Sequence, residues 1–219
     1  MILFRLDASI QGERSVSRQV ADTAEAAWRR ARPDGRVIHR DLATTPVPAD
    51  AWALAVTGNA TPEELRTDAQ RDAIALAAEL ADEMAQADAY VLAVPLYNYG
   101  VSQHVKTWLD LLFTDPRFAP GTEPLLAGRP TALVITRGGG YGEGTPRAGW
   151  DHATPWYRRM FGDLMRMDLH VSEVELTLAE VHDSMAPLRP LAKESLRAGH
   201  ESAERHGRVI AGQTASALT

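Results

Sequence analysis

Short apolar runs alternate along most of the chain with longer stretches of helical periodicity. Apolar or alternating runs predict strands at residues 2–6, 36–40, 90–94, 131–136 and 170–176. Apolar residues spaced along one helix face predict helices at residues 17–32, 69–85, 102–113, 152–167 and 187–211. Residues 42–68 contain three prolines and predict a long excursion with about one helical turn. Within it, Thr61-Pro62-Glu63-Glu64 is typical of a helix start.

Strands separated by helices of this length predict a single α/β domain that spans residues 1–219, since no repeat or flexible linker divides the chain. Right-handed crossovers would give one doubly wound parallel sheet of five strands with helices on both faces. Ligands of such sheets bind at the carboxyl ends of the strands. The loops after the first, third and fourth strands are therefore where a site is expected.

Composition narrows the chemistry. The 219 residues include no cysteine, which excludes disulfides, iron–sulfur clusters and thiolate nucleophiles, so a redox role needs a bound cofactor. The histidines lack metal-ligand spacing, and no metal site is expected. A net charge of −6 gives no long-range attraction to nucleic acid or to an anionic membrane, so neither is expected as a partner.

The apolar run at the N-terminus is too short for a signal peptide, and no apolar stretch reaches the length of a membrane span. We therefore expect a soluble, cytoplasmic protein.

The loop after the first strand combines serines with the start of a helix. It contains Ser9, Ser15 and Ser17. Hydroxyls and free backbone N–H groups at the beginning of a helix can hold a phosphate. The alternative is that Ser15 or Ser17 only caps the helix, as serine often does.

The next two loops suit a flat ligand. Residues 95–100 place Asn98 between two tyrosines, which offers apolar surface and directed hydrogen bonds; the alternative is a turn whose tyrosines cover the core. Residues 136–144 are rich in glycine, which allows close backbone approach, although they match neither the dinucleotide fingerprint nor a Walker loop; the alternative is a flexible loop. Together the three loops predict a mononucleotide that carries a flat ring system.

Three motifs in this order carry a resemblance. Residues 95–110 are similar to a P-x-Y-N-F motif followed by L-K-x-W-x-D, residues 136–139 to S-R-G-G, and Ser9 with residues 15–17 to a serine-rich phosphate loop. The chain thus resembles the FMN-dependent azoreductases and NAD(P)H:quinone oxidoreductases of the flavodoxin-like class, from the first strand to about Leu176.

The resemblance implies a flavodoxin-like fold, FMN as cofactor and NADH or NADPH as co-substrate. A hydride would pass in ping-pong order through the flavin to a quinone- or azo-type aromatic acceptor. The flavin carries this chemistry, so no catalytic side chain is assigned. The implied cofactor-binding residues are Ser9, Ser15, Val16 and Ser17 for the phosphate, and Pro95, Leu96, Tyr97, Asn98, Tyr99, Thr136, Arg137, Gly138 and Gly139 for the ring.

Aromatic residues after these loops indicate a substrate pocket, with Phe118, Tyr141 and Trp156 as its candidates. The aromatic loops at 114–126 and 140–160, together with the resemblance, imply a homodimer whose partner completes each pocket. The alternative is that these loops cover their own flavin as a lid. Lys106 and Asp110 have the spacing of a surface ion pair, which we favour over a catalytic role.

Two other functions stay open. The chain could be a flavodoxin-like electron carrier without a substrate pocket, or a tailoring reductase for one specific aromatic metabolite.

Overall fold

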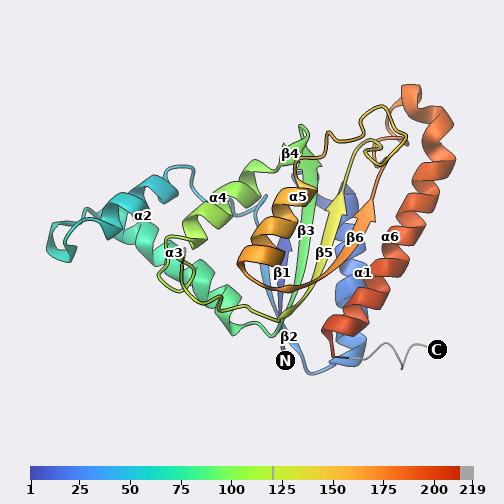
Figure 1. The fold of residues 1–219 in the computed structure, drawn as a ribbon. Coiled ribbons are helices and arrows are strands. Elements are labelled where there is room, and N and C mark those ends of the chain that lie inside the picture. The colour runs from blue at the N-terminus through green and yellow to red at the C-terminus, as the bar shows by residue number, and fades with distance from the viewer. Residues whose placement is uncertain (120, 213–219) are drawn as a thin grey trace.

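A computed structural model describes residues 1–119 and 121–212, and its centre is a parallel sheet (Figure 1). The strands are β1 (Ile2–Asp7), β2 (Arg36–Asp41), β3 (Ala89–Tyr97), β5 (Pro130–Thr136) and β6 (Asp168–Val174). Their order is β2-β1-β3-β5-β6, which confirms the predicted doubly wound sheet. One strand was not predicted: β4 (Gly100–Val101) pairs antiparallel with the end of β3.

Helices cover both faces of the sheet. α1 (Val16–Ala31) and α6 (Arg189–Ile210) lie against one face, whereas α3 (Asp68–Gln86) and α4 (Gln103–Leu112) lie against the other (Figure 1). The central strand β3 is buried on both sides. Its residues alternate between the two cores: Tyr90 and Leu92 pack toward α3 and α4, whereas Val91 packs toward α1 and α6. The continuous apolar run at 90–94 therefore marks the middle of the sheet.

The excursion at 42–68 contains more helix than predicted. α2 (Ala51–Asn59) has nine residues and packs against α3 and α4. Thr61-Pro62-Glu63-Glu64 does not start a long helix, because Glu63–Leu65 form a single 3₁₀ turn. The helix starts later, where Thr67 and Gln70 form a reciprocal capping box. The capping box of Thr67 and Gln70 thus determines where the helix begins, and the proline and glutamates at 62–64 do not.

The helix predicted at 152–167 is present but irregular. It begins as α5 (Thr154–Tyr157) and continues as a π-helix over Arg158–Leu164. The closing helix is shorter than predicted, because Asp183–Leu188 form a 3₁₀ turn that includes Pro187 before α6 begins. No helix in the part of the chain that the structure describes has the length and apolar character to cross a membrane.

Candidate active site

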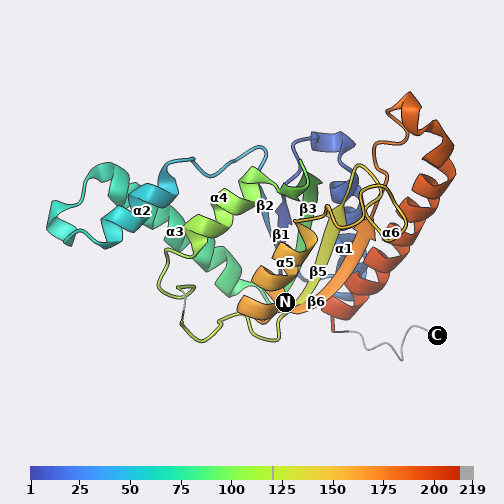
Figure 2. The ribbon, with the colours of Figure 1, turned by 45° about the horizontal axis from the view of Figure 1, so that its top comes forward.

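The loops that follow β1, β3 and β5 lie at the carboxyl end of the sheet (Figure 2). Residues of these regions line one crevice. Its volume is about 410 Å³, within the usual range of small-molecule sites. The lining comes from the ends of β3 and β5 and from the segments that follow β1, β5 and β6. Its residues are Ser9, Gln11, Arg14, Ser15, Val16, Pro95, Leu96, Tyr97, Thr136, Gly138, Thr177, Leu178 and Val181.

The serines of the first loop serve the helix and the crevice together. The Ser15 hydroxyl accepts a hydrogen bond from the backbone N–H of Arg18 at 3.3 Å, so Ser15 caps α1. The Ser15 and Ser17 hydroxyls lie 3.0 Å apart, and both side chains are buried. Ser9, Ser15 and Val16 also line the crevice. The loop predicted to hold a phosphate therefore also contains the cap of α1.

The second loop is the turn of a hairpin. Tyr97 pairs with Gly100, which leaves Asn98 and Tyr99 as a two-residue turn. Their φ angles are 49° and 66°, as a type I′ turn requires. Pro95, Leu96 and Tyr97 line the crevice, whereas Asn98 and Tyr99 lie outside its lining.

Tyr97 connects this hairpin to the first loop. Its hydroxyl lies 3.1 Å from the Ser9 hydroxyl and accepts a hydrogen bond from the backbone N–H of Ile10 at 3.2 Å. The segment expected at the ring and the segment expected at the phosphate are therefore joined through one phenol.

The glycine loop presents backbone donors. The carbonyls of Arg137, Gly138 and Gly139 accept hydrogen bonds at 3.1–3.2 Å from the N–H groups of residues 176–178. Among the described residues, none accepts a hydrogen bond from the N–H of Gly138 or Gly139. Oxygen atoms at the polar edge of a ring could accept from these N–H groups.

Close packing explains why residue 138 is a glycine. A Cβ atom at residue 138 would lie 2.6 Å from Cδ1 of Leu178, so a larger residue would displace this contact.

Sequence reasoning missed the segment after β6. Thr177, Leu178 and Val181 form one wall of the crevice, and the last two are exposed apolar side chains, at 41% and 72%. The signal was available: this segment follows a predicted parallel strand, so it reaches the same edge as the other loops.

Arg137 is held by carboxylates. Its guanidinium is buried and lies 2.7 Å from Asp151, 3.0 Å from Glu173 and 3.0 Å from Glu175. Burial acts to lower the pKa of Arg137, but these carboxylates outweigh it and the pKa is raised. Asp151 also accepts hydrogen bonds from the backbone and hydroxyl of Thr154. The network therefore holds the 140–153 loop against β6, and the Arg137 side chain does not line the crevice.

Three aromatic rings gather beside the hairpin. The ring centroid of Tyr99 lies 5.4 Å from that of Trp150 and 6.3 Å from that of Tyr141, both in edge-to-face geometry. The backbone N–H of His152 donates to the carbonyl of Tyr99 at 3.0 Å and fixes the loop to the turn. Tyr141, predicted for the substrate pocket, belongs to this aromatic cluster. Trp156 lies elsewhere, packed on the core beside Tyr157.

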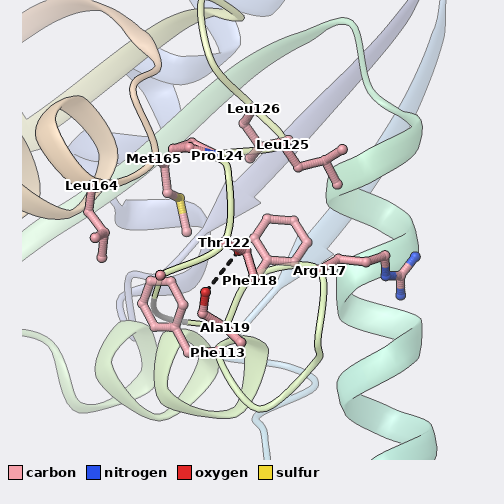
Figure 3. Close-up of a pocket in the computed structure, with 11 residues that line it drawn as sticks. Phe113, Arg117, Phe118, Ala119, Thr122, Pro124, Leu125, Leu126, Leu164 and Met165 are labelled. Atoms are coloured by element: carbon pink, nitrogen blue, oxygen red, sulfur yellow. Dashed lines mark hydrogen bonds between the residues drawn. The ribbon is translucent and has the colours of Figure 1, made fainter.

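Phe118 is also separate from the crevice. It is buried and lines a small cavity of about 40 Å³ with residues such as Phe113, Leu126 and Met165 (Figure 3). Arg117 beside it forms an ion pair with Asp82 of α3 at 2.5 Å. The structure therefore does not bring Phe118, Tyr141 and Trp156 together within one subunit.

Two simpler expectations can be compared with the structure. Lys106 and Asp110 form an ion pair at 2.6 Å on the surface of α4, as their spacing predicted. Over residues 1–119 and 121–212, no cluster of three histidines or carboxylates has the arrangement of a metal site.

Comparison with known proteins decides the family. A family model described as the flavodoxin-like fold matches residues 1–195. The FMN-dependent NADH:quinone oxidoreductase of Parafrankia sp. (strain EAN1pec) is 39% identical over 203 residues, which are 92% of this chain and 96% of that protein. The protein of the same name from Streptomyces avermitilis is 34% identical over 218 residues, 98% of this chain and 99% of its own length. The chain belongs to this oxidoreductase family.

Solved structures agree with the fold of this oxidoreductase. An azoreductase from Bacillus anthracis str. Sterne superposes with a TM-score of 0.74 at 22% identity, over 95% of this chain and 98% of its own. An FMN-dependent NADH-azoreductase from Bacillus anthracis str. Ames Ancestor, in complex with FMN, also gives 0.74 at 17% identity, over 96% and 99%. The predicted family, fold class and enzyme class are confirmed.

Proposed function

We propose that this oxidoreductase binds FMN in the crevice and passes electrons from NADH to a quinone- or azo-type aromatic acceptor. The observation that carries the proposal is the crevice itself, in which the serine loop, the hairpin and the glycine loop meet at one edge of the sheet. When bound there, FMN supplies the ability to accept and return a hydride.

The residues present fit a flavin mononucleotide. Ser9, Ser15 and Val16 line the end suited to a phosphate. Pro95, Leu96 and Tyr97 offer a mainly apolar wall for the ring. Gly138 also lines the crevice, and its backbone N–H, which donates to none of the described residues, is available to the ring's polar edge. The chain thus provides donors where the ligand has oxygens and apolar surface where it is flat.

The protein itself contributes the positioning of the flavin and the exclusion of water from it. Leu178 and Val181 form an apolar wall that a bound ring would cover, which would exclude solvent from that side of the ring. Because the flavin carries the hydride chemistry, we assign no side chain as a catalytic acid or base. A ping-pong order follows if the nucleotide and the acceptor use the same open face of the crevice in turn, so that the first must leave before the second enters.

The acceptor class rests on the aromatic cluster of Tyr99, Tyr141 and Trp150. Tyr99 and Trp150 are exposed beside the hairpin, and edge-to-face rings suit the recognition of a flat aromatic molecule. This cluster favours an enzyme with a substrate surface over a simple electron carrier. A reductase specific for one aromatic metabolite would use the same surface.

A direct test begins with apoprotein titrated with FMN and with FAD. Steady-state turnover is then measured with NADH and NADPH, each against a panel of quinones and azo dyes at several fixed concentrations. Tight binding of FMN, faster turnover with NADH and parallel double-reciprocal lines support the proposal. Failure to bind FMN, or reduction of one-electron acceptors without reduction of any quinone, would refute the enzyme as stated.

We further propose that the enzyme is a cytoplasmic homodimer, since NADH is supplied in the cytoplasm. The aromatic loops carry less exposed surface than the sequence suggested, because Phe118 and Tyr157 are buried. Exposed apolar side chains instead gather around α2, at Trp52, Val56 and Leu65. Burial of such a patch favours self-association. Light scattering should give twice the mass of the 219-residue chain, and a monomer with full turnover would contradict the dimer.

A further inference from the structure

The crevice is almost without charge. Its lining consists of hydroxyl, amide, aliphatic and aromatic residues, and among the described residues that line it Arg14 alone is ionised at neutral pH. Arg14 ends the short 3₁₀ turn Gly12–Arg14 and immediately precedes Ser15, the cap of α1. A single cation therefore stands at the end of the crevice that the serine loop forms.

The arginines nearest to this loop in the fold are already paired. Arg18 lies 2.7 Å from Asp41 and 3.5 Å from Asp7. Arg5 lies 3.1 Å from the same Asp7. Arg14 differs, because its exposed guanidinium has no carboxylate or hydrogen-bond partner among the described residues.

No acid of the helix start opposes Arg14. The first turn of α1 contains no acidic residue, and the neighbouring Glu13 lines a different pocket on the other side of the loop. Among the described residues that line the crevice, Arg14 therefore has no carboxylate to offset its charge, although the chain carries a net charge of −6.

A phosphate monoester carries about −1.5 to −2 charges at pH 7 and three acceptor oxygens. In a neutral crevice of an acidic protein, such an anion needs a local counter-charge. A guanidinium is suited to this role, since it donates two parallel hydrogen bonds to a phosphate and stays ionised.

We propose that Arg14 binds the phosphate of the flavin mononucleotide and makes the enzyme select FMN over riboflavin, which has the same ring but no phosphate. The inference deepens the proposed function and rests on it. Serine hydroxyls and backbone N–H groups would still orient the phosphate, whereas Arg14 supplies the charge. The affinity for the ring alone should be independent of Arg14.

The test compares two ligands on four proteins. Apoprotein of the wild type, Arg14→Ala, Arg14→Lys and Arg36→Ala is titrated with FMN and with riboflavin, and flavin fluorescence gives each dissociation constant. Arg36 is a matched control, because it is an exposed arginine at the start of β2, at the opposite end of the sheet. Circular dichroism confirms that all four proteins are folded.

For Arg14→Ala we expect FMN affinity to fall about 10-fold to 100-fold, as for a lost charged hydrogen bond, with riboflavin affinity unchanged within about twofold. Arg14→Lys should recover part of the loss, and Arg36→Ala should behave as the wild type. The salt dependence of FMN binding should also weaken in Arg14→Ala.

Equal losses for both flavins, or no loss for FMN, would overturn the proposal for Arg14. A wild-type protein that binds neither flavin would instead refute the proposed function, so the two failures are distinguishable.

Discussion

Asn98 has a backbone role in the hairpin turn, and its predicted contact with the flavin stays a prediction. Its φ of 49° belongs to the left-handed region, where asparagine and glycine are tolerated better than other residues. Tyr99 follows at 66°, so the turn places a bulky side chain in a conformation that costs about 1–2 kcal/mol. Such a cost is retained where the surrounding structure over-determines it.

The amide of Asn98 can be separated from its backbone by two substitutions. Asn98→Gly keeps the positive φ and removes the amide, whereas Asn98→Ala removes the amide and strains the turn. If the amide binds the ring, both variants should lose about 1–3 kcal/mol of flavin affinity, measured by titration of apoprotein. If Asn98→Gly binds FMN as the wild type does, Asn98 serves only the turn.

Arg137 is a second residue whose role the structure redefines. Three carboxylates surround its buried guanidinium. Arg137→Met would leave them without their shared cation, and we expect the free energy of unfolding to fall by about 3–5 kcal/mol in urea titrations. Arg197→Met is the matched control: Arg197 pairs with two glutamates on the exposed surface of α6, so its loss should lower the free energy of unfolding far less. Similar losses for both variants would contradict the assigned difference.

At the scale of elements, the segment between β6 and α6 completes the crevice. Its backbone pairs with residues 137–139, and its side chains form an apolar wall. Helix and strand periodicity describe neither property, because the segment has no regular structure. Its position follows from β6 being parallel to β5 and ending beside it.

The wall can be tested at Val181, whose side chain is exposed. Val181→Asn should weaken FMN binding to apoprotein about 5-fold to 20-fold, since part of the roughly 1.5–3 kcal/mol from burying a valine is lost. Leu191→Asn makes a similar change at an exposed position of α6 outside the crevice lining and should leave the FMN affinity unchanged. An unchanged FMN affinity for Val181→Asn would remove this segment from the flavin site.

At the scale of the whole molecule, two cores on opposite faces of one sheet carry the stability. α6 packs on both α1 and β6, and it closes the face opposite to α3 and α4 (Figure 1). A polar contact lies within this packing: the Nδ1 atom of His206 in α6 is 2.9 Å from the hydroxyl of Ser172 in β6. The ring of His170 lies 5.6 Å away.

This histidine should make the fold sensitive to mild acid. Burial, with the positive charges of His170 and Arg205, lowers the pKa of His206 to about 4. The unfolded chain binds this proton near pH 6.5, so stability is unaffected above that pH and decreases as pH falls from about 6.5 toward 4. The side chain is only partly buried, and we therefore expect a loss of about 1 kcal/mol between pH 7.5 and pH 5.

Urea unfolding at these two pH values checks the prediction. His206→Gln should be less pH-dependent than the wild type. The paired carboxylates do not interfere, because the pKa of Asp7, like those of Glu25 and Asp41, is lowered, and their contribution is lost only at pH values below this range. An equal pH dependence in the two proteins would refute the assignment to His206.

Much of the fold could be predicted because it depends on local periodicity. Apolar runs and helical spacing located all five parallel strands and the main helices, and the handedness of crossovers then placed the loops at one edge. The short strand β4 and the helix α2 were not predicted. β4 has two residues, too few to show a period. α2 carries apolar residues on its exposed side as well as on the side packed against α3 and α4, so its sequence shows no helical period.

For the site, the sequence determined which loops converge, because parallel strands bring their carboxyl ends to the same edge. The tertiary structure decided which side chains face the crevice. Arg137 lies in a predicted loop, yet Asp151, Glu173 and Glu175, all distant in sequence, surround its guanidinium. Phe118 follows α4 and is buried in the core on the α3 and α4 face of the sheet, beside a small cavity. The direction of a side chain depends on partners far along the chain, and no local pattern records them.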